Sequence, residues 1–199
     1  MIVLGGSTRL TGSGLSITEW KPFLGILPPL NHTDWVELFH KYQRTPEFQH
    51  INYTFSLKDF QNIFWLEYIH RLWGRLLGIP LLILSWQAYR HPLWKTFYKK
   101  RIFLLWAFGG MQGFMGWMMV KSGLHQQPHV SPFKLSLHLM ITAMIIFTLF
   151  SCLRSNKTLV LRKSASFHIT FGLVILTLFY GGLVAGHKAG LIYNTFPQM

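Results

Sequence analysis

Three long stretches of the sequence carry no Asp, Glu, Lys or Arg, and they constrain the fold more than any other feature. They cover residues 102–120, 135–153 and 166–186. Each is about 20 residues long, which lets a helix rising 1.5 Å per residue cross a hydrocarbon layer of about 30 Å. A soluble helical core would need polar faces on these segments, and they have almost none. The sequence therefore predicts an all-α fold, a polytopic transmembrane helix bundle.

A fourth candidate span, residues 63–89, is long enough but has charged residues in its first half. These are Glu67, Arg71 and Arg75, and His70 lies among them. Pro80 is expected to kink this helix, as prolines do inside membrane bundles without breaking them. With this segment, the predicted spans are 63–89, 101–120, 134–153 and 166–186.

The distribution of basic residues predicts the topology of these spans. The net charge is +13, which alone could suggest a nucleic-acid partner. However, the basic residues gather in alternate short loops, which is the positive-inside pattern of membrane proteins. The two clusters are Arg90, Lys95, Lys99, Lys100 and Arg101, and Arg154, Lys157, Arg162 and Lys163. We therefore expect no nucleic acid, and we expect both loops on the cytoplasmic or matrix side.

The remaining segments divide by composition. The single Cys152 excludes an internal disulfide.

The helical spacing of Trp35, Leu38, Phe39 and Tyr42 predicts a short interfacial helix over 33–42. The expected organisation is the end of a truncated first helix at 1–5, an outer loop at 6–62, helices two to four at 63–153, an inner basic loop at 154–165, a fifth helix at 166–186 and a truncated outer loop at 187–199.

A weak internal repeat links the two ends of the chain. Gly5-Gly6 is followed, eight residues after Gly6, by Gly14-Leu15, and Gly181-Gly182 is followed at the same spacing by Gly190-Leu191. The repeat suggests that the 166–186 span opens a second copy of the first unit.

Two histidines, His70 and His138, lie well inside predicted spans. Ionisable groups there are costly and usually functional. Both spans enter from the outer side, and at about 1.5 Å per residue both rings fall within about 6–11 Å of that surface. Neutral imidazole is a standard ligand of heme iron, and facing helices of a bundle are where such sites are built. The pair therefore predicts a heme site with His70 and His138 as axial ligands, although ordinary packing of either histidine stays open.

Glu67 lies one helical turn before His70 and has three interpretations. It takes part in substrate orientation or proton transfer, it pairs with Arg71 or Arg75, or it is solvated near the headgroups. A di-iron site is excluded because the other spans supply no carboxylates. Arg71 and Arg75 are candidates for contacts to heme propionates, and snorkelling to the interface is an equal alternative.

Five segments together resemble one family. They are LGGSTRLTGSGLSITEWKP (4–22), FWLEYIHRLWGRLLG (64–78), GGMQGFMGWMMVKSGL (109–124), HVSPFKLSLHLM (129–140) and GGLVAGHKAGLIYNTFPQM (181–199). The chain resembles heme A synthase of the cysteine-poor alphaproteobacterial and mitochondrial type, over essentially its whole length. Relative to that family, most of the first helix and everything after the fifth are missing, so the chain resembles a fragment.

The resemblance implies an eight-helix enzyme made of two four-helix halves. It implies oxidation of the C8 methyl group of heme O to a formyl group, which gives heme A for terminal cytochrome oxidases. Glu67 and His70 match the family's Glu-x-x-His motif, with Glu67 as the catalytic candidate, and His138 matches the histidine of the fourth helix. These residues belong to the half that holds the substrate heme O, and the other half binds a heme B cofactor through a second histidine pair.

The resemblance also implies partners and a location. We expect membrane lipid, heme O, a ferredoxin-like electron donor, heme O synthase and a homo-oligomeric state. The expected location is the bacterial or mitochondrial inner membrane. The alternative function is a non-catalytic b-type transmembrane electron-transfer cytochrome, which also uses paired histidines but has no need of Glu67 beside a ligand.

Overall fold

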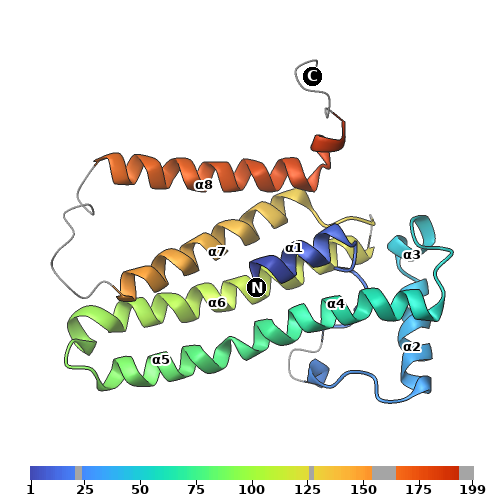
Figure 1. Ribbon diagram of the computed structural model, residues 1–199, viewed down its shortest axis with the longest axis horizontal. Helices are drawn as coiled ribbons and strands as arrows, with labels where there is room; N and C mark the ends of the chain where they lie inside the picture. The colour runs from blue at the N-terminus through green and yellow to red at the C-terminus, as the bar shows by residue number, and fades with distance from the viewer. Residues whose placement is uncertain (21–23, 126–127, 154–164, 193–199) are drawn as a thin grey trace. The chain divides into compact units, whose positions relative to one another are not determined.

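The computed structural model describes residues 1–20, 24–125, 128–153 and 165–192, and within these ranges the chain is helical with no strand (Figure 1). The predicted inner loop at 154–165 lies outside the described residues except for Ala165. The helices are α1 (Ile2–Leu10), α2 (His32–Gln43), α3 (Pro46–His50), α4 (Leu57–Leu76), α5 (Gly78–Arg90), α6 (Lys99–His125), α7 (Pro132–Leu153) and α8 (Ala165–Gly186), with 3-10 turns at Leu24–Ile26 and Ala189–Leu191 and a π-helical turn at Trp94–Tyr98.

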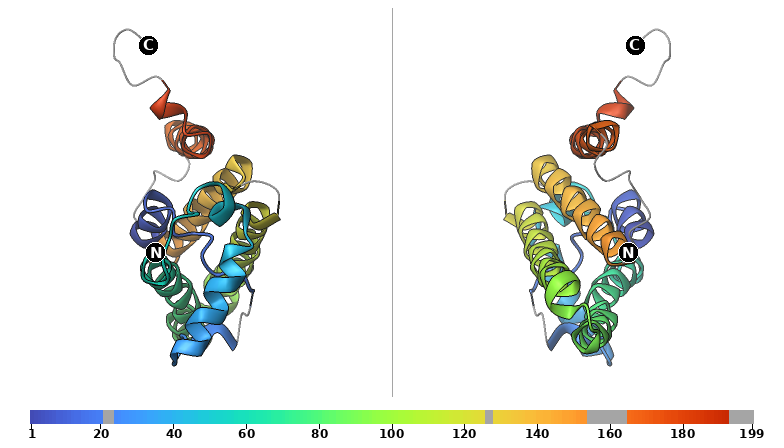
Figure 2. Two further views of the ribbon diagram at one scale, coloured as in Figure 1. Left: turned by 90° about the vertical axis from the view of Figure 1, so that its right-hand side faces the viewer. Right: turned by 90° about the vertical axis from the view of Figure 1, so that its left-hand side faces the viewer.

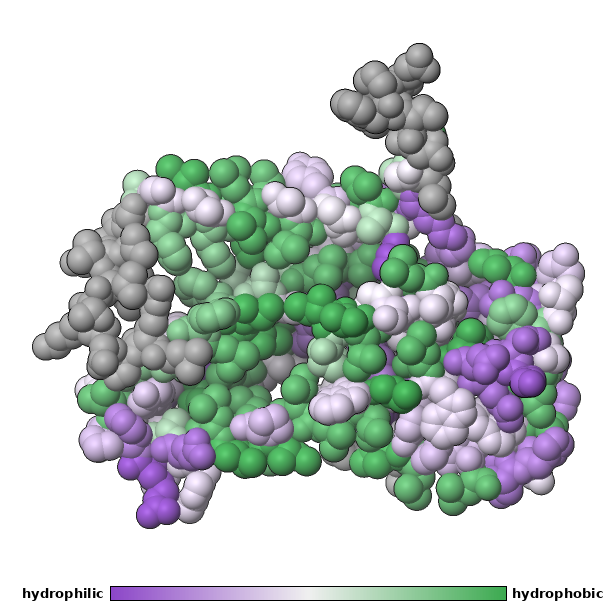
Figure 3. Space-filling view, in the orientation of Figure 1, coloured by the Kyte–Doolittle hydropathy of each residue, from purple (hydrophilic) through white to green (hydrophobic). Residues whose placement is uncertain are grey.

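Three helical segments within the described ranges are long and apolar enough to cross a membrane. They are Trp94–Leu124, Pro132–Cys152 and Ala165–Gly186, and they contain the three spans predicted from charge-free sequence almost to the residue. Apolar side chains cover much of the surface in Figure 3, as expected of a protein that faces lipid. On α8 alone, Ile169, Leu173, Leu176, Tyr180 and Val184 are exposed. The all-α membrane helix bundle is therefore confirmed.

The fourth predicted span, 63–89, is not among these three helical segments. The structure divides it into α4 and α5, with the break at Leu77, three residues before Pro80. The interruption expected near Pro80 is one residue long, because Leu77 keeps a helical φ of −61° and ψ of −19° between its two helical parts. A proline has no N–H to donate to the carbonyl four residues earlier, and its ring crowds that carbonyl. For Pro80 that carbonyl belongs to Leu76, the last residue of α4. The discontinuity therefore appears one turn upstream of the proline that causes it.

Both ends of the predicted outer loop are helical. Helix α1 continues to Leu10 rather than ending at residue 5, and the chain turns just beyond it at Gly12, which has a positive φ of 65°. Helix α4 starts at Leu57 rather than residue 63. Ser56 and Asp59 form a reciprocal capping box there, in which the hydroxyl accepts from the Asp59 amide and the carboxylate accepts from the Ser56 amide.

The chain divides into two compact units, one of Met1–Pro80 with Trp117–Val130 and the other of Leu81–Gly116 with Ser131–Met199. The first unit has an aromatic core between α2 and α4. Tyr42 and Phe60 are fully buried there, and Trp35 packs edge-on against Phe64 with ring centroids 4.9 Å apart. The apolar face of α2, predicted to lie in a membrane interface, packs against α4.

A buried polar network closes this core at α3. The Tyr42 hydroxyl donates to Glu47 Oε2 at 3.0 Å and accepts from Asn52 Nδ2 at 2.8 Å. Glu47 is 6% exposed, and this burial raises the pKa of its carboxyl to about 7, while the Tyr42 hydrogen bond opposes the rise. Glu47 is thus a carboxyl that titrates near neutrality.

The second unit is built around α7. Ala88 of α5, Ile102 and Leu105 of α6 and Cys152 of α7 form its buried cluster. Helix α8 runs beside α7 in all views (Figures 1 and 2). Gly182 makes this approach possible, because a Cβ there would lie 2.5 Å from Ser136 Oγ and 2.8 Å from its Cα. Cys152 is buried among apolar side chains, in keeping with ordinary packing.

Candidate functional site

Glu67 is a buried carboxylate with a full set of hydrogen bonds. Its side chain is 3% exposed, and Oε2 accepts from the Ser16 hydroxyl at 2.6 Å and from the Ile17 backbone N–H at 2.9 Å. Oε1 accepts from Arg71 Nη2, one turn along α4. Pairing with Arg71 is therefore the interpretation that the geometry supports, and a solvated Glu67 is excluded. An ion pair so buried is retained only when further hydrogen bonds satisfy it, as they do here.

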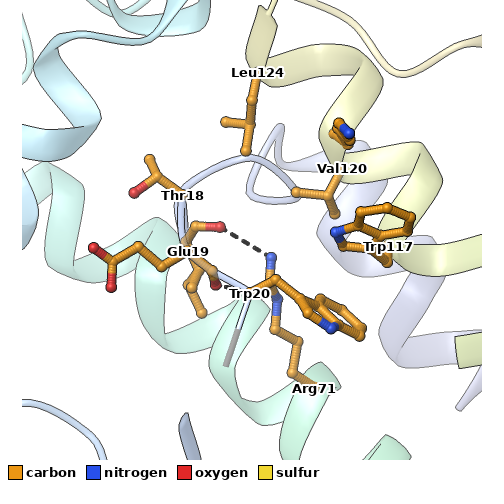
Figure 4. Close-up of a pocket in the computed structure, with 9 residues that line it drawn as sticks. Thr18, Glu19, Trp20, Arg71, Trp117, Val120 and Leu124 are labelled. Atoms are coloured by element: carbon orange, nitrogen blue, oxygen red, sulfur yellow. Dashed lines mark hydrogen bonds between the residues drawn. The ribbon is translucent and has the colours of Figure 1, made fainter. Parts of the chain in front are cut away.

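Arg71 holds the same loop from the other side. Nη2 donates to the Ile17 carbonyl at 3.0 Å and Nη1 to the Glu19 carbonyl at 3.4 Å, as the dashed lines in Figure 4 show. Together with the Glu67 bond, these contacts use three of the five guanidinium N–H groups. Arg71 and Glu67 thus fasten residues 16–19 onto α4.

A cavity of about 180 Å³ opens between this loop and α6. It is lined by Ile17, Thr18, Glu19, Trp20, Arg71, Trp117, Val120, Lys121 and Leu124 (Figure 4). Ligand sites usually enclose about 300–1,000 Å³, so this cavity is too small for a porphyrin. The Arg71 guanidinium lines this cavity together with Trp20 and Trp117.

His70 faces α1 at a glycine. A Cβ on Gly5 would lie 3.3 Å from His70 Nε2, and a Cβ on Gly74 would lie 3.7 Å from Met1 Cε. Because residue 1 meets residue 74 and residue 5 meets residue 70, α1 runs antiparallel to α4. The missing side chain at Gly5 leaves the room that the imidazole uses.

His138 also faces a glycine, on α6. A Cβ on Gly116 would lie 3.6 Å from His138 Cε1. One turn earlier on the same helix, Gln112 Nε2 lies 3.1 Å from His138 Nε2 and donates to Thr142 Oγ1 at 2.7 Å. The Thr142 hydroxyl donates to the His138 carbonyl at 3.0 Å. The side chain of His138 is therefore held within a polar triad inside the second unit.

The predicted site residues are distributed over the two units. Glu67, His70 and Arg71 come together on α4 in the first unit, and half-buried Arg75 lies one turn further along that helix. His138 belongs to the second unit. That His70 and His138 share one heme stays a prediction.

Sequence reasoning missed several residues that the structure places at the site. Gln112 could have been found, because an amide in an otherwise apolar span needs a partner. Gly116 is one of four closely spaced glycines on α6, and a Cβ added to any of the other three, Gly109, Gly110 or Gly113, would meet no atom within 4 Å among the described residues. Ser16 and the Ile17 amide carry no signal, since their pairing with Glu67 depends on a contact across about 50 residues.

The residues present fit a heme iron ligated by imidazoles. Each histidine ring packs close to the backbone of a glycine: a Cβ added there would lie 3.3 Å from His70 Nε2 and 3.6 Å from His138 Cε1. Among the described residues no group of three or more His, Cys, Asp or Glu could hold a metal ion by itself.

These features define a polytopic α-helical membrane protein with a histidine on each of two helices and a buried carboxylate one turn from one of them. The whole chain, residues 1–199, matches the sequence model of the cytochrome oxidase assembly protein (COX15-CtaA) family. The chain belongs to this family.

Curated relatives agree with this assignment. Over the full chain, it is 47% identical to heme A synthase of Paramagnetospirillum magneticum, covering 59% of that protein. It is 43% identical to heme A synthase of Granulibacter bethesdensis, covering 55%, and 44% identical to that of Brucella ovis, covering 57%. The chain thus spans a little over half the length of these relatives. No solved structure matches it.

Proposed function

We propose that the intact protein is a heme A synthase, which oxidises the C8 methyl group of heme O to a formyl group. The observation that carries this proposal is the similarity of all 199 residues to heme A synthases at 43–47% identity. The net change removes four electrons from one carbon. In the proposed sequence, two hydroxylations each consume one O₂ with two protons and two electrons from the donor and release one water, and the resulting geminal diol then loses water. The product serves terminal cytochrome oxidases.

In this proposal the chain's own residues hold and orient the substrate. His70 and His138 supply neutral imidazoles to the iron of heme O, and glycines opposite each ring leave space for them. Glu67 lies one turn from His70. Its hydrogen bonds with Ser16, Ile17 and Arg71 hold the loop of residues 16–19 in place. Arg71 and Arg75 are proposed to contact the propionates, with Arg71 using the N–H groups that the loop carbonyls leave over.

The proposal extends to what lies beyond these residues. We propose that electrons come from a ferredoxin-like donor by way of a heme B held elsewhere in the intact protein. We also propose contact with heme O synthase and with further copies of the protein. The membrane is that of a bacterial cell or the mitochondrial inner membrane.

The hemes extracted from cells test this function directly. A strain lacking the gene is complemented with the intact protein or with variants, and its hemes are separated by chromatography. We expect heme A with the unaltered protein and its loss, with accumulated heme O, in His70→Ala and His138→Ala. His168→Ala, at the opposite end of α8 from Gly182, is the control and should keep heme A. Wild-type heme A output in either of the first two variants would contradict the assignment.

The same measurement separates the alternative, a b-type electron-transfer cytochrome. That protein would bind heme without producing heme A in any strain. Replacement of Glu67 by Ala discriminates poorly, because Glu67 also anchors residues 16 and 17 and its loss disturbs either protein. Glu67→Gln keeps most of the hydrogen-bonding capacity and removes the charge. We expect it to retain bound heme and lose heme A.

A further inference from the structure

The contact between Gln112 and His138 can be assigned atom by atom. Thr142 has one hydroxyl proton, which goes to the His138 carbonyl at 3.0 Å. Its oxygen can therefore only accept from Gln112, which lies 2.7 Å away. This places the amide NH₂ of Gln112, and not its oxygen, toward the histidine. The second N–H then points at His138 Nε2, 3.1 Å away.

With the amide in this orientation, which leaves Gln112 Oε1 without a hydrogen-bond partner among the described residues, the protonated nitrogen of His138 follows. Because Nε2 accepts a hydrogen bond, it has the lone pair, and the proton of the neutral ring is on Nδ1. A metal-binding imidazole uses the same lone pair. The hydrogen bond from Gln112 and a bond to iron are therefore mutually exclusive uses of one orbital.

We propose that Gln112 is a positioning residue that competes with iron for Nε2 of His138. It selects Nε2 as the ligating atom, and it offers His138 an alternative partner when the iron bond breaks. In that exchange one Fe–N bond is replaced by one N–H···N hydrogen bond, with no change of charge or oxidation state. The inference rests on the proposed function, in which a heme must be released after reaction.

The proposed role predicts that removing Gln112 strengthens heme binding, whereas a contact that only stabilises the fold predicts no gain in affinity. Without Gln112, the free state of His138 loses its hydrogen bond, while the iron-bound state loses nothing. Heme should then bind about fivefold more tightly, which is the equivalent of one neutral hydrogen bond. The gain should appear as slower dissociation.

The test is a titration of the intact purified protein with hemin, followed by absorption, with dissociation measured by transfer to apomyoglobin. The variants are Gln112→Leu, Thr142→Val, which removes the group that orients the amide, and Gln87→Leu on an exposed position of α5 as matched control. We expect slower hemin release in the first, a smaller change in the second and none in the third. In a His138→Ala background, Gln112→Leu should have no effect.

A second readout does not involve heme. Nitrogen chemical shifts of labelled histidine should show His138 with its proton on Nδ1 in the unaltered protein and a mixture of tautomers in Gln112→Leu. Equal or faster hemin release in both Gln112→Leu and Thr142→Val, or a Gln112 effect that persists without His138, overturns the proposal. If hemin binding does not change in His70→Ala and His138→Ala at all, the proposed heme site itself fails, and the role of Gln112 fails with it.

Discussion

Each of the two candidate ligands lies against a glycine of a neighbouring helix, and this pairing makes the glycines as informative as the histidines. The approach is closer at Gly5. A Cβ added there would lie 3.3 Å from His70 Nε2, whereas one added to Gly116 would lie 3.6 Å from His138 Cε1. The first distance is tighter than ordinary contact and the second is not. Substitution at position 5 should therefore disturb its histidine more.

Gly5→Val should weaken heme binding on the order of tenfold, because overpacking of this kind typically costs about 1–3 kcal/mol. Gly6→Val is the matched control, since it makes the same change in the same helix but its Cβ meets no atom within 4 Å. Hemin titration of the intact protein measures both. Equal affinities for the two variants would show that Gly5 does not shape the His70 site.

Glu47 predicts a pH dependence away from the heme site. Its pKa is about 7 in the folded protein and near 4.5 when unfolded, so the folded state binds the proton more tightly. The stabilisation is complete below the unfolded pKa and is lost as pH rises through 7. Between pH 5 and pH 8 the loss is roughly 2 kcal/mol.

Hydrogen exchange of amides in α2 and α3 measures this effect, since these helices surround the Tyr42–Glu47–Asn52 network. Protection should fall from pH 5 to pH 8 after correction for intrinsic exchange. Glu47→Gln should flatten the profile, because it cannot ionise. A variant that keeps the full pH dependence would assign it to another group.

Among the helices, α7 and α8 are joined by glycines at one end. Gly182 leaves no room for a side chain beside Ser136, and Gly186 is equally close to Pro132. Further along, Phe147 and Phe171 pack with ring centroids 4.8 Å apart. Close backbone approach at one end and aromatic packing at the other hold the pair together without a hydrophobic driving force from water.

Gly182→Leu should separate these two helices at the Ser136 end. Phe133→Cys and Phe179→Cys replace two side chains whose rings lie 6.0 Å apart, and cross-linking of the two thiols by a short bifunctional reagent reports the separation in a Cys152→Ala background. We expect cross-linking to fall to about a tenth or less, since a clash with backbone atoms is not relieved by side-chain rotation. Gly181→Leu, whose Cβ meets no atom within 4 Å, should keep it.

The helices differ in how well the sequence predicts them, because different interactions set their cores and their ends. Charge-free runs are required by hydrocarbon, so the cores of α6, α7 and α8 were predictable. The start of α4 depends on the Ser56–Asp59 cap, and the break at Leu77 depends on a carbonyl upstream of Pro80. Such boundaries are set by single hydrogen bonds, which hydropathy does not register.

The candidate site also has a part that the sequence predicts and a part that it does not. Glu67 and His70 were predictable as ionisable groups in an apolar setting, and their spacing along one helix needs no tertiary information. The bonds from Ser16 and Ile17 to Glu67 and from Gln112 to His138 join segments far apart in sequence. They depend on which helix faces which, and that is decided by packing.

At the scale of the whole molecule, the alternating basic loops predict the orientation of the helices. A reporter fused after Arg101 should lie on the cytoplasmic or matrix side, and one fused after His125, at the far end of α6, on the opposite side. Alkaline phosphatase and green fluorescent protein fusions, which are active on opposite sides, measure this. The reverse pattern would overturn the charge argument and with it the outer placement of the Glu67 loop.

The contact between Glu67 and the segment at Ser16 and Ile17 has a consequence for how the chain enters the membrane. If α4 enters the membrane as the sequence predicts, the carboxylate in its middle costs about 2.5–3.5 kcal/mol until it finds partners. Its partners are made some 50 residues earlier, so they are already synthesised when α4 emerges. Helix α1 and residues 16–17 are thus in place before α4 is made. Helix α4 would then enter the membrane already paired with α1, so that Glu67 is never without its hydrogen-bond donors there.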